Sequence, residues 1–146
     1  MIEGFVPDNF YVNAVGTLRI GENGKLYHIH GKSPIVITGK LNLYGTQIRE
    51  LPDGLSMGGD LNLRGTQIRE LPEGLNVGGD LDLSLSQIRK LPEGLRVEGG
   101  LSLSDTQIRE LPEGLSVGGG LYLADTQIRE LPPDLKVGGE ILGFKS

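Results

Sequence analysis

Apolar and polar positions alternate along this chain in a pattern that repeats every 20 residues. Its clearest part is an apolar–polar–apolar triplet, Leu-x-Leu, which is typical of a short strand with one buried face. The five triplets begin at Leu41, Leu61, Leu81, Leu101 and Leu121. The decapeptide TQIRELPDGL at 46–55 also returns four times with few changes. A fixed period of this length predicts one structural unit stacked on copies of itself.

The aliphatic positions of each unit predict a continuous apolar interior. About six aliphatic side chains recur per unit, and one unit cannot bury them without its neighbours. Parallel strands about 4.8 Å apart would align these side chains in columns. Burial of each side chain stabilises the fold by about 1.5–3 kcal/mol. Gly-Gly pairs such as Gly58-Gly59 close most units, and we expect them to provide positive φ at a corner.

The segment 1–33 breaks the period and is expected to cap the stack. Within it, 18–30 holds two alternating stretches around Asn23-Gly24, a pattern that favours a β-hairpin. The aromatic residues available to cover the first repeat are Phe5, Phe10, Tyr11 and Tyr27. A solenoid needs such a cap for solubility.

The repeats themselves are expected to span 34–142 with five full units, followed by a tail at 143–146. Ile35 and Ile37 match the second half of a unit. Near the other end, Glu140–Phe144 begins another strand, and an open strand edge invites pairing with a second chain. The alternative is that Phe144 folds over the last layer.

Composition excludes several classes of protein. The net charge of −5 argues against direct binding of nucleic acid or a membrane surface. The chain has no cysteine, and hence neither a disulfide framework nor a cysteine nucleophile. It shows neither a secretory leader nor an apolar segment long enough to span a membrane. We therefore expect a cytoplasmic protein.

The motif Leu-x-Leu-x-x-Thr-x-Ile-x-x-Leu-Pro resembles the leucine-rich repeat, in the 20-residue form found in bacterial proteins. Repeats close to LPEGLxVGG are similar to those of bacterial and phage-encoded proteins. The resemblance implies a β-rich solenoid with short parallel strands on a concave face, an irregular convex side and an N-terminal hairpin cap. In that family an Asn at the hydroxyl position hydrogen-bonds the neighbouring turn, a role that Thr46 and its equivalents would fill less fully. Pentapeptide and hexapeptide solenoids fit the spacing less well.

Few residues suggest chemistry. His28 and His30 would share one strand face, but two ligands without a third are weak evidence for a metal site. No nucleophile–base set is apparent, so we expect neither an enzyme, a cofactor nor a metal. An arginine column lies beside a mostly acidic one, which largely cancels its field and indicates a solvated flank. These columns are Arg49, Arg69, Arg89, Arg109 and Arg129, and Glu50, Glu70, Lys90, Glu110 and Glu130.

The positions that differ between copies lie on the predicted strand face, where partners usually dock on a leucine-rich repeat. Among them, three large side chains are expected to point into water amid mostly acidic neighbours, an arrangement typical of a binding hot spot. The predicted partner-binding residues are Tyr44, Asp60, Arg64, Asp80, Asp82, Leu85, Asp105, Tyr122 and Asp125. The alternative is neutral drift on an unselected face.

The sequence thus predicts a module that binds a protein with a basic surface through the concave face. The phage-like repeats suggest an inhibitor of a nucleic-acid-handling host protein. The second hypothesis is a structural solenoid that forms homo-oligomers through its C-terminal edge. Light scattering separates the two, since a strict monomer at high concentration would remove the second.

Overall fold

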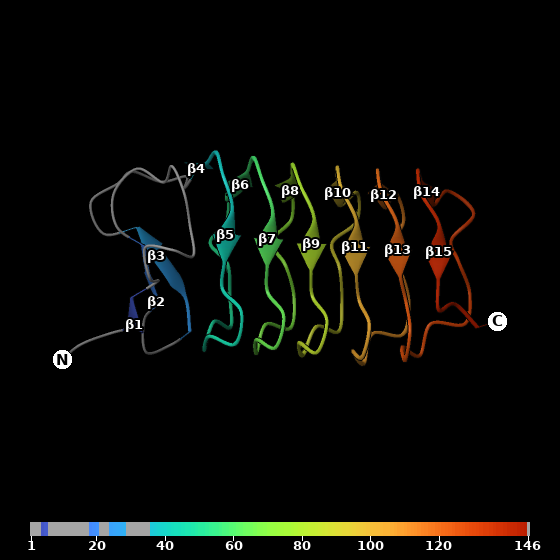
Figure 1. Ribbon diagram of the computed structural model, residues 1–146, viewed down its shortest axis with the longest axis horizontal. Helices are drawn as coiled ribbons and strands as arrows, with labels where there is room; N and C mark the ends of the chain where they lie inside the picture. Colours follow the sequence, from blue (N-terminus) through green and yellow to red (C-terminus); the bar gives the residue numbers. More distant parts are fainter. Residues whose placement is uncertain (1–3, 6–17, 21–23, 29–35, 146) are drawn as a thin grey trace.

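The computed structural model of this chain is a parallel β-solenoid of about five turns (Figure 1). It describes residues 4–5, 18–20, 24–28 and 36–145. Within these ranges the chain forms two six-stranded parallel sheets and one three-stranded antiparallel sheet, and it contains no helix. The predicted β-rich solenoid of stacked 20-residue units is therefore confirmed. Because no helix is present in these ranges, none of them contains one long and apolar enough to cross a membrane.

The first six-stranded sheet, the front sheet, is formed by the Leu-x-Leu segments. Its strands are β5 (Leu41–Asn42), β7 (Leu61–Asn62), β9 (Leu81–Asp82), β11 (Leu101–Ser102), β13 (Leu121–Tyr122) and β15 (Ile141–Leu142). Every neighbouring pair is parallel with an offset of 20 residues, so that Leu81, for example, lies between Leu61 and Leu101. This register brings side chains of equivalent positions into columns.

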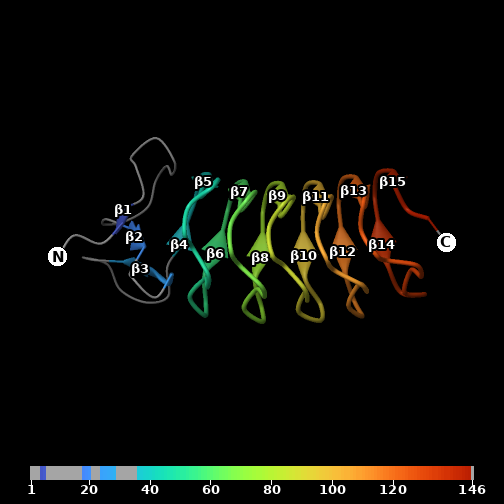
Figure 2. The ribbon, with the colours of Figure 1, turned by 90° about the horizontal axis from the view of Figure 1, so that it is seen from below.

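The second six-stranded sheet, the return sheet, lies on the path back and is seen as a row of arrows in Figure 2. Its strands are β4 (Val36–Ile37), β6 (Ser56–Met57), β8 (Asn76–Val77), β10 (Arg96–Val97), β12 (Ser116–Val117) and β14 (Lys136–Val137). Ile37 pairs with Met57, as the sequence match predicts, whereas Ile35 lies outside the described residues. The return path is thus more regular than an irregular convex side would be.

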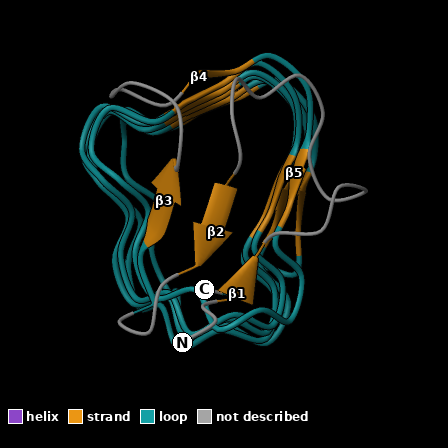
Figure 3. Cartoon of the chain, turned by 90° about the vertical axis from the view of Figure 1, so that its left-hand side faces the viewer, coloured by secondary structure: helices purple, strands orange, loops and turns teal. Residues whose placement is uncertain are grey.

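Viewed along the axis, the coils superpose and the two sheets form two sides of one cross-section (Figure 3). In both side views they follow one another along an almost straight line (Figures 1 and 2). The predicted concave face corresponds to the outer side of the front sheet. Six aliphatic columns fill the interior. In the third coil these residues are at most 2% exposed: Leu81, Leu83, Ile88, Leu91, Leu95 and Val97.

One column of small hydroxyl residues closes a turn within each coil. Its members are Thr46, Thr66, Ser86, Thr106 and Thr126. In each of the five units the hydroxyl donates to the carbonyl of the leucine three residues earlier, at 2.6–2.8 Å. Thr66 is 2% exposed and bonds to Leu63 in this way. The expectation that these hydroxyls bond to the neighbouring turn is therefore wrong. A hydroxyl is too short to span coils and instead caps its own turn, as Ser and Thr commonly do.

The glycine pairs allow the backbones of adjacent coils to pack closely, and they do not provide positive φ angles. None of the pairs in the described coils has positive φ, so the expected corner is wrong. One position is glycine in all six described copies, which we call the glycine column: Gly39, Gly59, Gly79, Gly99, Gly119 and Gly139. From Gly59 onward, an added Cβ would lie 2.6–2.9 Å from a backbone atom of the preceding coil. Positive φ occurs elsewhere, as at Gly54 (φ 79), the third residue of the Pro52–Leu55 turn.

The N-terminal part contains the predicted hairpin and one strand more. β2 (Leu18–Ile20) pairs antiparallel with β3 (Leu26–His28), and β1 (Gly4–Phe5) adds to β2. After the turn, the carbonyl of Gly24 accepts hydrogen bonds from the amides of Arg49 and Glu50, at 2.7 and 3.1 Å. Lys25 continues this contact with a parallel bridge and an ion pair to Glu50. The hairpin thereby adjoins the first coil. The side chains expected to form the cap lie outside the described structure.

At the other end the core is only partly covered. Phe144, together with Leu131, Leu135 and Val137, packs against the core as a partly buried side chain. Ile141 and Leu142 in β15 are 37% and 48% exposed. The predicted covering by Phe144 is therefore present over part of this last layer. Self-association through β15 stays a prediction.

We expect Gly119→Ala to lower the free energy of unfolding by about 1–3 kcal/mol, because its Cβ would lie 2.9 Å from the amide nitrogen of Gly100. Denaturant unfolding followed by circular dichroism measures this. Gly100→Ala is the matched control. Its Cβ would meet no atom closer than 3.4 Å, and it should be neutral or stabilise by up to about 1 kcal/mol. Equal stability of the two variants would contradict the close-packing role.

Candidate functional site

The outer side of the front sheet, the front face, carries three columns of side chains that point away from the core. They begin at Lys40, Asn42 and Tyr44 and recur every 20 residues. Burial alternates along the strands as predicted: Leu81 and Leu83 are buried, whereas Asp80 is exposed and Asp82 is half-buried. The structure thus places six of the nine predicted binding residues on this face: Tyr44, Asp60, Arg64, Asp80, Asp82 and Tyr122.

Two of these aspartates join adjacent coils. One carboxylate oxygen of Asp60 accepts the amide of Asp80 at 2.8 Å, and one of Asp80 accepts the amide of Gly100 at 2.8 Å. These bonds extend the ladder of the front sheet by one residue. This structural role was not predicted from the sequence, because it depends on three-dimensional proximity between residues 20 positions apart.

Asp82 has a structural role within its own coil. Its carboxylate accepts the amide of Ser84 at 2.9 Å. Asn42 and Asn62 make the same bond two residues ahead with their amide oxygens. Asparagine and aspartate are therefore equivalent for the backbone at this column, and they differ only in charge.

The remaining three predicted residues do not lie on the strand face, so that part of the prediction is wrong. Leu85, Asp105 and Asp125 occupy the turn after the front strand with φ of 58–59°. Gly45 and Gly65 have positive φ in the equivalent turns of earlier coils. Aspartate tolerates this left-handed conformation because its short side chain bonds locally, whereas leucine is strained there. Leu85 is nevertheless 51% exposed.

The two tyrosines of the front face are not brought together. Tyr44 lies beside β5 and Tyr122 in β13, four strand spacings or roughly 19 Å apart. They are 56% and 41% exposed. Tyr122 leans across its sheet: its ring would contact a Cβ added at Gly120 or at Gly100, with the hydroxyl 2.7 Å from the first of these positions.

A depression of about 420 Å³ lies beside Tyr122 and is the most distinctive feature of the front face. We call it the front depression. Nine residues line it, and four of them are glycines, which we call its floor: Gly99, Gly100, Gly119 and Gly120. The other lining residues are Asp80, Leu81, Asp82, Ser102 and Tyr122. Ser102 is held in place by a hydroxyl–hydroxyl bond of 2.6 Å to Ser84.

Gly100 and Gly120 are not among the binding residues predicted from the sequence, although their column varies between copies. The sequence does carry one sign of the hollow. The column changes from charged residues in earlier coils to glycine, and the charged residues are Lys40, Asp60 and Asp80. Two adjacent coils without side chains leave a hollow only if neighbouring side chains do not fill it. That outcome depends on the direction of the Tyr122 ring, which the sequence does not specify.

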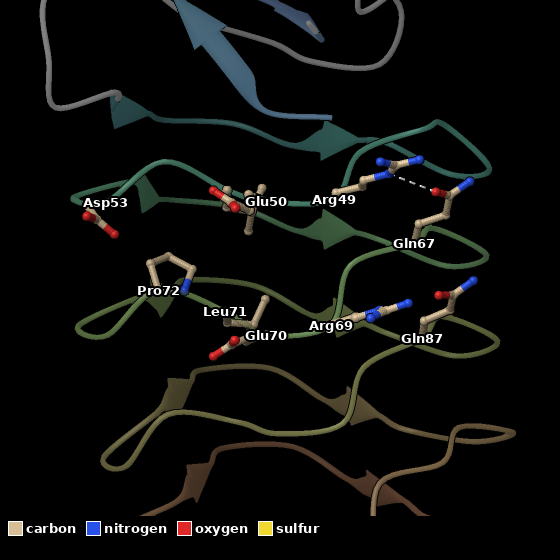
Figure 4. Close-up of a pocket in the computed structure, with 10 residues that line it drawn as sticks. Arg49, Glu50, Asp53, Gln67, Arg69, Glu70, Leu71, Pro72 and Gln87 are labelled. Atoms are coloured by element: carbon tan, nitrogen blue, oxygen red, sulfur yellow. Dashed lines mark hydrogen bonds between the residues drawn. The ribbon is translucent and has the colours of Figure 1, made fainter. Parts of the chain in front are cut away.

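A larger depression of about 620 Å³ lies on the charged flank, near the N-terminal end of the stack (Figure 4). Figure 4 shows Arg49 and Arg69 with the Gln67 and Gln87 amides on one side, and the carboxylates on the other. Arg49 donates from Nε to the Gln67 carbonyl oxygen at 3.0 Å. The lining carries two guanidinium groups and three carboxylates, so its charges largely cancel. The front depression, with charge of one sign only, is the better candidate for selective binding.

The two histidines predicted as a weak metal pair are not both described. His28 ends β3, whereas His30 lies outside the described residues. In that part of the chain no three histidine or acidic residues gather in a group able to hold a metal ion.

Comparisons of the chain with family models, with curated proteins and with solved structures find no match.

We expect Leu85→Gly to raise the free energy of unfolding by about 0.5–1 kcal/mol, because glycine relieves the left-handed strain at φ 59°. The measurement is denaturant unfolding of the 146-residue chain. The control is Leu142→Gly, which changes an exposed leucine within a strand. That change should lower stability by about 0.5–1 kcal/mol, since glycine weakens strands. A loss of stability on Leu85→Gly would show that this side chain stabilises the fold.

Proposed function

We propose that this solenoid is a binding module, and that a partner protein docks on its front face at the front depression. One observation carries the proposal: carboxylates and an exposed aromatic ring border the same glycine-floored hollow on an otherwise regular sheet. Aromatic anchors surrounded by polar groups are typical of interface hot spots. The proposed role is binding without catalysis.

The rigidity of the front face supports this role. The four inner strands of the front sheet, β7, β9, β11 and β13, are each hydrogen-bonded to a neighbour on both sides. Asp60, Asp80 and Asp82 are further held by backbone amides. A partner would therefore find its contacts already arranged. Binding to a preorganised surface costs less conformational entropy than binding to a loop that must first be ordered.

The charge of the front face supports a partner with a basic surface. Asp80 and Asp82 line the depression, and no basic residue does. Asp105 and Asp125 add exposed carboxylates in the adjoining turns, and the whole chain has a net charge of −5. Complementary charge accelerates association and disfavours acidic competitors.

We further propose that the chain is a leucine-rich-repeat protein of bacterial or phage type, acting as an inhibitor of a nucleic-acid-handling host protein. The support is the resemblance of LPEGLxVGG and of the Leu-x-Leu motif, together with the acidic front face. A basic nucleic-acid-binding surface is the kind of surface that such a face complements.

The test is a tagged pull-down from bacterial lysate with three forms of the chain. Tyr44→Arg combined with Tyr122→Arg adds two positive charges to the front face. Asn76→Arg combined with Ser116→Arg adds the same charge to the return sheet. We expect a protein that the unmodified chain and the return-sheet variant both capture, and that the front-face variant loses. Capture that all three forms share would contradict docking at the front face.

A further inference from the structure

We infer that the front depression is a receptor for one arginine side chain of the partner. This inference rests on the proposed docking face only for the source of the arginine, since the hollow itself can be tested without a partner. The inference names the chemical group that the front face binds, a guanidinium, whereas the proposed function names only a partner with a basic surface.

The geometry over Gly100 defines the position of that group. From the point that a Cβ on Gly100 would take, ring atom Cε2 of Tyr122 is 3.5 Å away, and Oδ1 of Asp80, the oxygen that accepts the Gly100 amide, is 3.8 Å away. A carboxylate and an aromatic ring thus lie close to one point above a bare backbone. A flat cation can stack on the ring while its edge meets the carboxylate.

Both aspartates keep an oxygen for a ligand. The Oδ1 atom of Asp80 accepts the Gly100 amide, and the Oδ1 atom of Asp82 accepts the Ser84 amide. Among the described residues, no hydrogen bond or ion pair engages the Oδ2 atom of either carboxylate. The internal bonds fix the two groups without neutralising their charge. A fixed pair of acceptors suits the several N–H donors of a guanidinium better than the point charge of an ammonium.

The floor of the hollow exists only because two coils lack a side chain there. A Cβ at Gly120 would come within 2.7 Å of the Tyr122 hydroxyl, so Tyr122 requires glycine at that position to lie across the sheet. At Gly100 a Cβ would make only ordinary contacts, the nearest at 3.4 Å. Side chains at the equivalent positions 40, 60 and 80 are accommodated in the fold. Gly100→Thr should therefore fold normally and fill the depression.

The experiment is an NMR titration of the ¹⁵N-labelled 146-residue chain with the blocked tripeptide acetyl-Gly-Arg-Gly-amide. Matched peptides carry lysine or citrulline, the neutral isostere of arginine. We expect saturable shifts at the Gly99, Gly100, Gly119 and Gly120 amides and at the Tyr122 ring. Binding of the citrulline peptide should be at least tenfold weaker, and that of the lysine peptide several-fold weaker.

Three variants sharpen the test. Asp80→Asn combined with Asp82→Asn removes both charges while preserving both acceptor oxygens, as Asn42 and Asn62 show for the second position. It should weaken arginine binding at least tenfold, and Gly100→Thr should abolish it. Glu73→Gln combined with Glu93→Gln makes the same charge change at exposed positions outside the depression, and it should alter binding less than twofold. Unchanged circular dichroism confirms that each variant folds.

Equal binding of the arginine and citrulline peptides would overturn the inference, as would shifts confined to the charged flank. Equal binding of the lysine peptide would overturn the assignment to arginine. The pull-down tests the docking face separately from the arginine receptor, so either proposal can fail without the other. Arginine binding in the depression, with partner capture unaffected by the combined Tyr44→Arg and Tyr122→Arg change, would keep the receptor and refute the docking face. The reverse result would keep the docking face and refute the receptor.

Discussion

Consecutive coils are joined by backbone hydrogen bonds on two faces at once, in the front sheet and in the return sheet. Both ladders have the same 20-residue offset, so neither sheet can shift without breaking the other. The glycine column brings the backbones of adjacent coils within contact distance, which a side chain at those positions would prevent. We call this shared 20-residue offset of the two sheets the double registration. The six aliphatic columns, the turns within each coil and the exposed columns all depend on it.

The same constraint determines where this molecule can vary. Interior columns must remain aliphatic, and the glycine column must remain glycine, so only the outward columns and some turns can change without loss of packing. In coils three to five the front face changes from carboxylate to glycine and from aspartate to tyrosine. These changes create the front depression. The proposed binding site is thus made from positions that the stacking leaves free, and it is as rigid as the stack beneath it.

Much of the fold could be predicted from the sequence, because a strict period states which residues must be equivalent. The Leu81 and Leu83 columns and the pairing of Ile37 with Met57 followed directly. The predictions were wrong where one residue type can serve two structural purposes. Glycine can provide positive φ or allow two backbones to approach closely, and the glycine pairs do the second. A threonine hydroxyl can bond to a neighbouring turn or to its own, and that of Thr66 bonds to its own. The residues aligned with Leu85 are glycine or aspartate, the types that favour a left-handed turn, and this turn is where Leu85 lies. The front depression depends on side-chain direction, which periodicity does not determine.

The most direct test of the double registration is denaturant unfolding of two deletion variants. Deletion of 81–100 removes one whole coil and preserves the offset, whereas deletion of 81–90 removes half a coil. We expect the first variant to keep a strand-type circular dichroism spectrum and to unfold cooperatively at lower denaturant, with a smaller dependence of its unfolding free energy on denaturant concentration. The second should lose cooperative unfolding. Equal unfolding curves for the two variants would contradict the claim that a fixed 20-residue register holds this protein together.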